Sequence, residues 1–418
     1  MMFGLYLHIP FCRHRCSYCD FNTYAGLEAW MAPYVGALKE EMAWVRRQFG
    51  GPVPVDTVYF GGGTPSLLPI PLWEGLFRAL HTHFRVAEDA EITVEANPES
   101  VTEASLRALR ALGVNRLSLG MQAVHPQDLR LLSRVHDFPA VIRAVALARK
   151  AGFENLNVDL IYGLPGQPLT RWQETLAWAL RLAPDHLSCY ALTLEHGTPL
   201  QAWVARGRVP EPDDDLAADM YAWTREVLGE AGFVQYELSN WARPDRACRH
   251  NLKYWRWEPY LGLGAGAHGF AAGVRTANVR APQAYVQRLL KAREPARPFP
   301  WTPATVVYHR VSLREAAEEL MFMGLRLVQE GVPRARFERV VGRPLEDVYG
   351  PVLQELAQMD LVVWDAQGVR LTPRALPVAN QVFVRLLDPP LPGNGHGTLS
   401  DRRTSGPSAS SPTAFPSA

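Results

Sequence analysis

Six short apolar runs alternate with longer amphipathic stretches over the first 230 residues, and this alternation constrains the fold more than any other feature. The apolar runs are rich in Val, Ile, Leu and Tyr, which is typical of parallel strands covered on both faces. They span residues 3–9, 57–60, 91–95, 116–121, 156–161 and 186–192. Helical patterns follow at about 27–49, 70–84, 102–112, 138–151, 169–182 and 213–231. Six β/α units in succession predict a parallel sheet with right-handed crossovers, either doubly wound or curled into a partial barrel.

Glycines and polar or charged side chains follow the carboxyl end of every predicted strand. They are three cysteines, Gly61 to Pro65, Glu95 to Pro98, Gln122, Asp159 to Pro165 and Glu195. A site that draws on all six strand ends is typical of a barrel, whereas a doubly wound sheet gathers its site at one switch point. We therefore expect an α/β fold in which residues 1–232 form a partial (β/α)6 TIM-like barrel. Strand-to-helix turns also favour Gly, Pro and Asp for purely local reasons.

The sequence after the barrel predicts three further regions. Residues 233–300 are aromatic, then glycine-rich, and end in a Pro/Arg-rich linker, so we expect them to complete the core. Residues 301–387 predict a small, mainly helical, winged-helix-like domain, with helices near 313–329, 333–341 and 345–359 before a short hairpin. The last of these helices has no Lys or Arg, which argues against a nucleic-acid reader. The tail, 388–418, is rich in Pro, Gly and Ser and is predicted to be disordered.

Charge and hydropathy exclude several classes of protein. The 43 Lys and Arg residues balance 42 Asp and Glu residues, and a nucleic-acid or anionic-membrane binder would carry a charge excess. No run of 18 apolar residues is present, so a transmembrane segment is not expected. The start has no basic region before its first apolar run, which differs from a secretory signal. We expect a cytoplasmic protein whose partners are small cofactors and other proteins.

Three of the five cysteines, Cys12, Cys16 and Cys19, lie within eight residues directly after the first predicted strand. Such close spacing makes a poor disulfide framework and a good metal site. Iron–sulfur clusters usually take four cysteines, so three would leave one iron without a protein ligand. An open coordination position is what a catalytic metal needs. The basic residues at 13–15 would help to deprotonate the thiols.

A structural zinc site is the alternative interpretation of these cysteines. It would have Cys3His ligation, with His8 or His14 as the fourth ligand. Zinc sites usually contain paired C-x2-C units, which this loop lacks. A [4Fe–4S] cluster is therefore the favoured prediction.

The cysteine spacing on this fold, followed by the Gly61–Pro65 run, resembles the radical S-adenosylmethionine (SAM) superfamily. The resemblance implies that SAM chelates the free iron and that electron transfer from the cluster cleaves it. An electron donor for the cluster is then a required partner. Glycines at 61–63 would let the backbone approach the SAM amino group closely.

Further motifs are similar to the oxygen-independent coproporphyrinogen III oxidase family, and the resemblance spans about residues 3–387. They are Tyr6 to Cys12, Cys16 to Phe21, Gly61 to Ser66, Glu95 to Pro98 and Asp159 to Pro165. The resemblance implies that the SAM site is lined by Tyr6, Tyr18, Gly62, Gly63, Thr64, Glu95, Gln122, Arg134, Asp159 and Ala191. Glu95 and Asp159 could accept hydrogen bonds from ribose hydroxyls, and Arg134 could pair with a carboxylate.

Two features depart from the oxidases and resemble the HemW heme-chaperone branch of the family. Phe21 stands where the oxidases carry a fourth cysteine. Residues 250–255 form an HNxxYW motif: His250, Asn251, Leu252, Lys253, Tyr254 and Trp255. The resemblance implies heme bound near His250, Asn251, Tyr254 and Trp255, and its delivery to a heme-accepting protein such as a respiratory hemoprotein.

Three alternatives stay open from the sequence. Cys248 is a second possible heme ligand, since imidazole and thiolate both bind heme iron. The segment 236–260 could simply close the open side of the barrel. The protein could also be an oxidase that decarboxylates coproporphyrinogen III, or a non-catalytic scaffold with a structural cluster.

Overall fold

The computed structural model describes residues 1–292 and 297–391 and divides the chain into two compact units. The first unit contains residues 1–252 and 258–308, and the second contains residues 253–257 and the chain from residue 309 onward. Most of the predicted tail, from residue 392, and part of the predicted linker, 293–296, lie outside the described residues.

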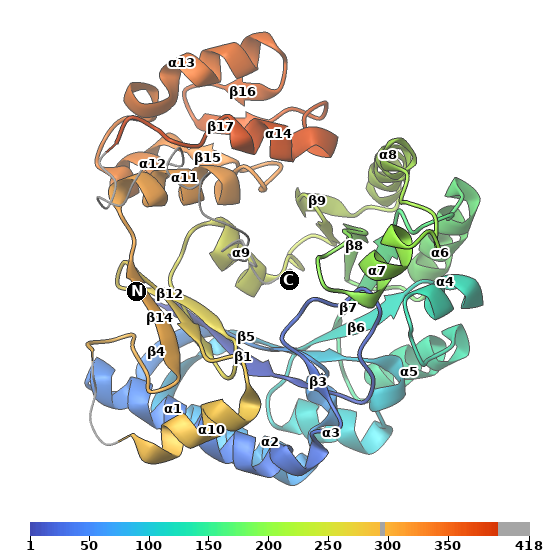
Figure 1. Cartoon of the computed structure of the whole chain (residues 1–418), viewed down its shortest axis with the longest axis vertical. Coiled ribbons are helices and arrows are strands. Elements are labelled where there is room, and N and C mark those ends of the chain that lie inside the picture. The colour runs from blue at the N-terminus through green and yellow to red at the C-terminus, as the bar shows by residue number, and fades with distance from the viewer. Residues whose placement is uncertain (293–296, 392–418) are drawn as a thin grey trace. The chain divides into compact units, whose positions relative to one another are not determined.

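Six parallel strands form the centre of the first unit, which confirms the predicted α/β barrel-type fold (Figure 1). They lie in the chain's own order, as β/α units joined by right-handed crossovers require. They are β1 (Phe3–Ile9), β4 (Val53–Gly62), β5 (Phe84–Ala96), β6 (Arg116–Gln122), β7 (Asn155–Tyr162) and β8 (His186–Ala191). Two short strands, β2 (Phe11–Cys12) and β3 (Tyr24–Ala25), pair in the loop that carries the cysteines.

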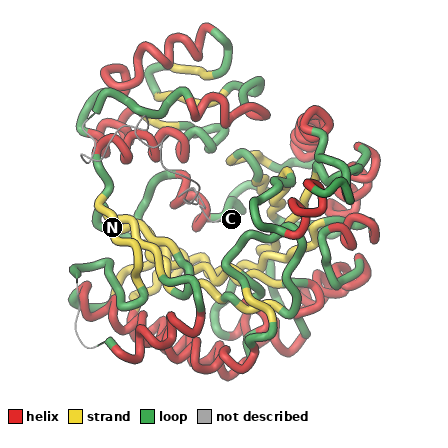
Figure 2. The backbone as a smooth tube through the Cα atoms, viewed as in Figure 1, coloured by secondary structure: helices red, strands yellow, loops and turns green. Residues whose placement is uncertain are grey.

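Helices cover the outer face of this sheet (Figure 2). They are α1 (Met31–Phe49), α2 (Ile70–His83), α3 (Glu103–Ala111), α5 (Phe138–Lys150), α6 (Leu169–Arg181), α8 (Asp214–Glu230) and α10 (Pro282–Lys291). Two short helices, α4 (Pro126–Leu131) and α7 (Pro199–Ala205), instead contact the loop that carries the cysteines. Side-chain caps begin several of them, for example Asp137 at α5 and Asp213 at α8. Phe60 of β4 packs on Trp73 and Phe77 of α2, so its neighbours in β4 face the inner side of the sheet.

Segments after the barrel extend the sheet at both ends to twelve strands. β10 (Asn240–Ala242) and β9 (Val234–Glu237) join antiparallel beside β8. Beyond β1 lie β11 (Tyr260–Leu263), β12 (His268–Ala271), β13 (Val274–Asn278) and β14 (Thr305–Arg310). The glycine-rich stretch near residue 264 therefore supplies strands to the sheet, and helix α9 (Arg249–Trp255) precedes them.

The fully buried Glu41 of α1 fastens this glycine-rich stretch to the core. Its carboxylate accepts hydrogen bonds from the Gly264 backbone N–H (2.8 Å), Asn278 Nδ2 (2.8 Å), the Tyr285 hydroxyl (2.6 Å) and the Thr302 hydroxyl (2.6 Å). Burial raises the pKa of Glu41, and these four donors oppose that rise. A buried carboxylate with this many donors is a structural element.

The second unit has the predicted order of helices followed by a hairpin. It contains α11 (Leu313–Gly324), α12 (Arg334–Val341), α13 (Leu345–Gln358) and α14 (Ala379–Val384), with a small sheet of β15 (Val332–Pro333), β17 (Gly368–Leu371) and β16 (Val362–Trp364). The segment 253–257 packs within this unit: the Trp257 indole N–H donates to Glu319 (2.8 Å), and Arg326 lies over the Trp255 ring.

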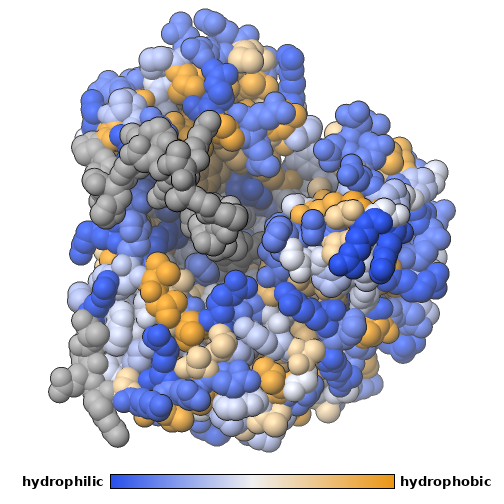
Figure 3. All heavy atoms as spheres, viewed as in Figure 1, coloured by the Kyte–Doolittle hydropathy of each residue, from blue (hydrophilic) through white to orange (hydrophobic). Residues whose placement is uncertain are grey.

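The face of the first unit drawn in Figure 3 is mainly hydrophilic, with scattered apolar residues. Among residues 1–292 and 297–391, no helix combines the length and the apolar character needed to cross a bilayer.

Candidate cofactor site at the barrel mouth

The three clustered cysteines lie on the loop between β1 and α1, and all three are half-buried. Backbone contacts fix the loop at both sides: Thr64 N donates to Phe11 O (2.8 Å), and the Ser17 hydroxyl donates to Leu131 O (2.6 Å). His8 Nε2 contacts Asn22 O at 3.0 Å, and the Asn22 amide donates to Ala265 O at 2.9 Å. The loop is therefore held by α4 and by the segments that follow β4 and β11, the two strands that flank β1.

Each cysteine sulfur contacts a different polar side chain. The Thr64 hydroxyl donates to Cys12 (3.7 Å), Arg134 donates to Cys16 (3.4 Å), and Cys19 contacts the Thr23 hydroxyl (3.9 Å). Hydrogen bonds to sulfur stabilise a thiolate and tune a bound cluster. Thr23 was not among the predicted site residues, although it lies only four residues after Cys19.

Burial has a larger effect on the pKa of two of the loop cysteines than the nearby positive charge has. It raises the pKa of Cys12 to about 11, against the opposing hydrogen bond from Thr64. It also raises the pKa of Cys19, although Arg15 acts in the opposite direction. The expectation that residues 13–15 deprotonate the thiols therefore does not hold for these two cysteines. Metal binding must displace their protons, as metal binding to thiols commonly does.

In the described parts of the chain, no three His, Cys, Asp or Glu side chains converge on one point as ligands of a single metal ion would. In a cubane cluster each thiolate binds its own iron, so the sulfurs need not converge on one point. The residues present fit such a cluster by number, by donor type and by their separate hydrogen-bond partners.

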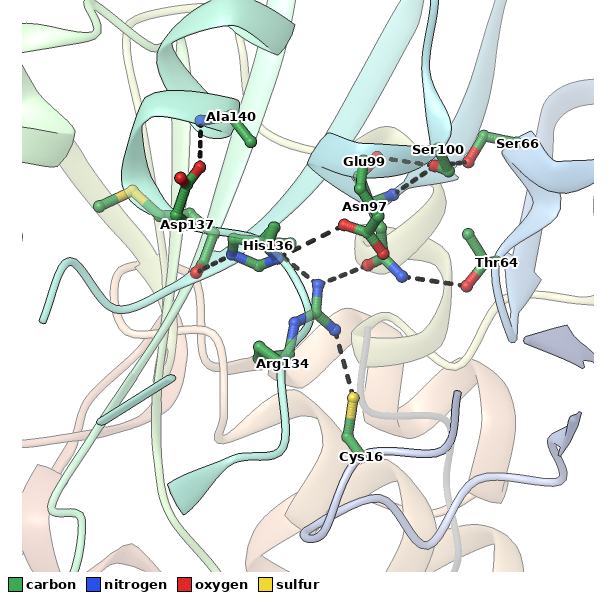
Figure 4. A network of polar contacts seen from close by, with 12 residues as sticks. Cys16, Thr64, Ser66, Asn97, Glu99, Ser100, Arg134, His136, Asp137 and Ala140 are labelled. Atoms are coloured by element: carbon green, nitrogen blue, oxygen red, sulfur yellow. Dashed lines mark hydrogen bonds and ion pairs between the residues drawn. The ribbon is translucent and has the colours of Figure 1, made fainter. Parts of the chain in front are cut away.

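Arg134 connects the cysteine loop to the ends of β5 and β6, and Figure 4 shows the network. Its guanidinium donates to Cys16, to Asn97 Oδ1 (2.5 Å) and to Gly120 O (2.9 Å). Asn97 in turn donates to the Thr64 hydroxyl at 3.1 Å. A pocket is lined by these four side chains together with Arg13 and His14. Asn97 lies in the Glu95–Pro98 motif and was not a predicted site residue, yet it joins Arg134 and Thr64, which were.

The glycine run at the end of β4 leaves no room for side chains. Gly62 has a φ of +114°, and a Cβ there would lie 2.3 Å from the His8 ring. A Cβ on Gly63 would lie 2.6 Å from Phe11 O. Only glycine combines this backbone conformation with these close approaches.

Two half-buried carboxyl groups lie on β5 and β7, the strands on either side of β6. Glu95 of β5 accepts from the Tyr59 hydroxyl (2.9 Å) and from Gly62 N (3.0 Å). Burial, followed by the charge of Asp159, raises the pKa of Glu95 to about 7. Asp159 of β7 accepts from Ser118 (3.0 Å) and Asn157 (2.7 Å), and burial raises its pKa as well. Both can accept hydrogen bonds from a ligand hydroxyl when ionised.

The remaining expected SAM residues lie on other strands of the same sheet or on the cysteine loop. Tyr6 of β1 contacts His8 Nδ1 through its hydroxyl (2.9 Å), and Tyr18 packs near Leu132, Ile161 and Leu164. Gln122 ends β6 with a φ of +66°, a strained conformation that is frequent at functional sites. Ala191 ends β8. The buried donors and acceptors and the glycine cradle fit a ligand such as SAM.

The residues expected to contact heme are buried. His250 is 1% exposed, Asn251 3%, and Tyr254 and Trp255 6% each. His250 Nδ1 contacts the Thr57 hydroxyl at 2.8 Å, and the His250 ring stacks on Tyr59. Cys248 is also buried, and burial raises its pKa to about 12. As folded, neither His250 nor Cys248 is presented to a macrocycle.

Comparisons with known proteins identify the family. The radical SAM superfamily model matches residues 6–179, and the HemN C-terminal domain model matches residues 311–378. The heme chaperone HemW of Bacillus subtilis is 36% identical over 383 residues, which cover 91% of this chain and 98% of the relative. The chain belongs to the HemW family of radical SAM proteins.

Other relatives agree with this membership. The heme chaperone HemW of Mycobacterium tuberculosis is 40% identical over 83% of this chain and 89% of its own length. A mouse mitochondrial protein named radical S-adenosyl methionine domain-containing protein 1 is 37% identical over 92% of this chain and 87% of its own length. The structure of Escherichia coli coproporphyrinogen III oxidase superposes with a TM-score of 0.78 at 24% identity, over 92% of this chain and 90% of that one. It supports the fold.

Proposed function

We propose that this protein is a heme chaperone that carries a [4Fe–4S] cluster and SAM and delivers heme to a heme-accepting protein. The observation that carries the proposal is identity of 36–40%, over 83–91% of the chain, to two bacterial proteins named heme chaperone HemW. Phe21 supports it, because this 39% exposed ring stands two residues after Cys19, where the oxidases have a cysteine.

The barrel mouth would hold the cluster and SAM. Cys12, Cys16 and Cys19 would bind three irons, and the cluster would supply one-electron reduction of SAM. Glu95 and Asp159 would accept from the ribose hydroxyls, and the Gly62–Gly63 backbone would face the amino group. Arg134 already donates to Cys16 and Asn97, so its role would be to position the cysteine loop.

As folded, the HNxxYW motif does not present a side chain that could serve as an axial heme ligand. The His250 ring is buried against Thr57 and Tyr59. We therefore assign heme binding to the protein without giving an axial role to His250. The partners would be a hemoprotein such as a respiratory one and a reductant for the cluster. The cytoplasm is the proposed compartment.

The alternative function is decarboxylation of coproporphyrinogen III, favoured only by the likeness in fold to the oxidase. The two functions separate in one anaerobic experiment on the reconstituted full chain. Heme titration should give a saturable Soret band, and coproporphyrinogen III with SAM and a reductant should stay unconverted. Absence of the Soret band together with formation of protoporphyrinogen IX would replace the chaperone by the oxidase.

A further inference from the structure

His250 lies against the inner face of the sheet, at the start of α9. Its ring contacts the Thr57 hydroxyl through Nδ1 at 2.8 Å and stacks on Tyr59, with 5.3 Å between ring centres and 26° between ring planes. Thr57 and Tyr59 are alternate residues of β4, so both point to the inner face. One strand therefore holds the imidazole by an edge contact and by a face contact.

The backbone of His250 is fixed as well. Glu91 of β5 accepts from the backbone N–H groups of Arg249 and His250, at 3.0 Å each, and from the Cys248 thiol at 3.5 Å. A carboxylate at a helix start satisfies N–H groups that have no partner within the helix and interacts favourably with the helix dipole. Both the main chain and the side chain of His250 are thus tied to the barrel.

Tyr59 connects His250 to the proposed SAM site. Its hydroxyl donates to Glu95 Oε1 at 2.9 Å, and the other Glu95 oxygen accepts from Gly62 N at 3.0 Å. The Tyr59 ring also stacks on Tyr6 at 6.2 Å. A ring in contact with His250 and Tyr6 has little freedom to swing about its Cα–Cβ bond, so its hydroxyl oxygen stays beside Glu95.

We propose that His250 is a positioning residue for the SAM site, which fixes Tyr59 and, through its hydroxyl, the Glu95 carboxylate. This inference rests on the proposed SAM site. It gives the first residue of the HNxxYW motif a role inside the barrel, at a site where the motif was expected to bind heme.

The chemical effect follows from the surroundings of Glu95. The groups that face it are Tyr6 of β1, Tyr59 and Gly62 of β4, Arg116 of β6 and Asp159 of β7. Burial and Asp159 favour the neutral acid, whereas the Tyr59 hydroxyl, Gly62 N–H and Arg116 favour the carboxylate. If Tyr59 is released, Glu95 loses a donor and stays protonated to a higher pH. A protonated Glu95 is a weaker acceptor for a ribose hydroxyl.

The test is SAM binding by anaerobically reconstituted full chain, measured by equilibrium dialysis from pH 6 to 9. For His250→Ala we expect binding about tenfold weaker at neutral pH, the size of one lost hydrogen bond to a charged group. The midpoint of the pH profile should rise by about half to one pH unit. Tyr59→Phe should reproduce this rise. His250→Asn, whose amide can reach Thr57 as Nδ1 does, should restore part of the affinity.

Leu252→Ala is the matched control, because it shortens a half-buried side chain of the same helix. It should leave the pH midpoint unchanged, so loosening of α9 alone would not imitate the effect. Wild-type affinity and pH midpoint in His250→Ala, with SAM binding intact in the wild type, would overturn the positioning role. Failure of the wild type itself to bind SAM would instead overturn the proposed SAM site. Loss of the heme Soret band in His250→Ala with unchanged SAM binding would restore His250 as the heme contact.

Discussion

Glu91 and Glu95 lie on the same face of β5, four residues apart, yet their surroundings differ. Glu91 accepts from Cys248, Arg249 and His250 and holds the start of α9. Glu95 accepts from Tyr59 and Gly62, and its pKa is raised to about 7. Glu91, farther from the carboxyl end of β5, has a structural role at the start of α9. Glu95, near that end, can gain or lose a proton and can accept a hydrogen bond from a ligand.

The cysteines show the same difference between mouth and interior. Cys12, Cys16 and Cys19 are half-buried on a loop, while Cys189 and Cys248 are buried in the barrel. Replacing the three loop cysteines by Ala should abolish iron binding and the brown chromophore, because all three proposed cluster ligands are removed. Cys189→Ala is the control and should keep both. The measurement is iron content with the visible spectrum after anaerobic reconstitution; retained iron in the triple variant would contradict the cluster site.

The raised pKa of Glu95 predicts a pH dependence of stability. Since the folded-state pKa lies above the unfolded value, the stabilising contribution of the neutral acid is complete below pH 4.5 and is lost as the pH rises to about 7. Across that window the free energy of unfolding should fall by up to about 3 kcal/mol from this group. Glu95→Gln should flatten the fall, and denaturant titrations of the SAM-free protein measure it. An unchanged slope would mean that Glu95 titrates normally.

Gly62 at the mouth and Gly26 in the cysteine loop both have positive φ, but only Gly62 lies against other atoms. A Cβ at Gly62 would lie 2.3 Å from His8, whereas one at Gly26 would meet nothing within 4 Å. Gly62→Ala should therefore destabilise the protein by about 2 kcal/mol more than Gly26→Ala, a typical cost of overpacking. It should also weaken SAM binding. Equal melting temperatures for the two variants would show that the His8 ring and the backbone at Gly62 can shift to make room for a Cβ.

The sequence predicted the barrel well, because β/α alternation is a local pattern. Strand bounds were less accurate where charges interrupt an apolar run: β5 begins at Phe84, although Glu88 and Asp89 suggested a later start at residue 91. The position of the cysteines and glycines at the mouth was also predictable, because each set lies close together in sequence. The contact between His250 and Thr57 joins residues 193 positions apart, and no local pattern encodes it. Burial of the HNxxYW motif became apparent only from the structure.

A protein that carries heme for another protein must be able to transfer its heme to that acceptor. Full chain loaded with heme under anaerobic conditions is mixed with an apo-hemoprotein, and the Soret band of each is followed. We expect heme to leave this protein and to appear in the acceptor faster than it appears in a passive heme scavenger. Heme that stays bound, or that reaches acceptor and scavenger at the same rate, would contradict this expectation.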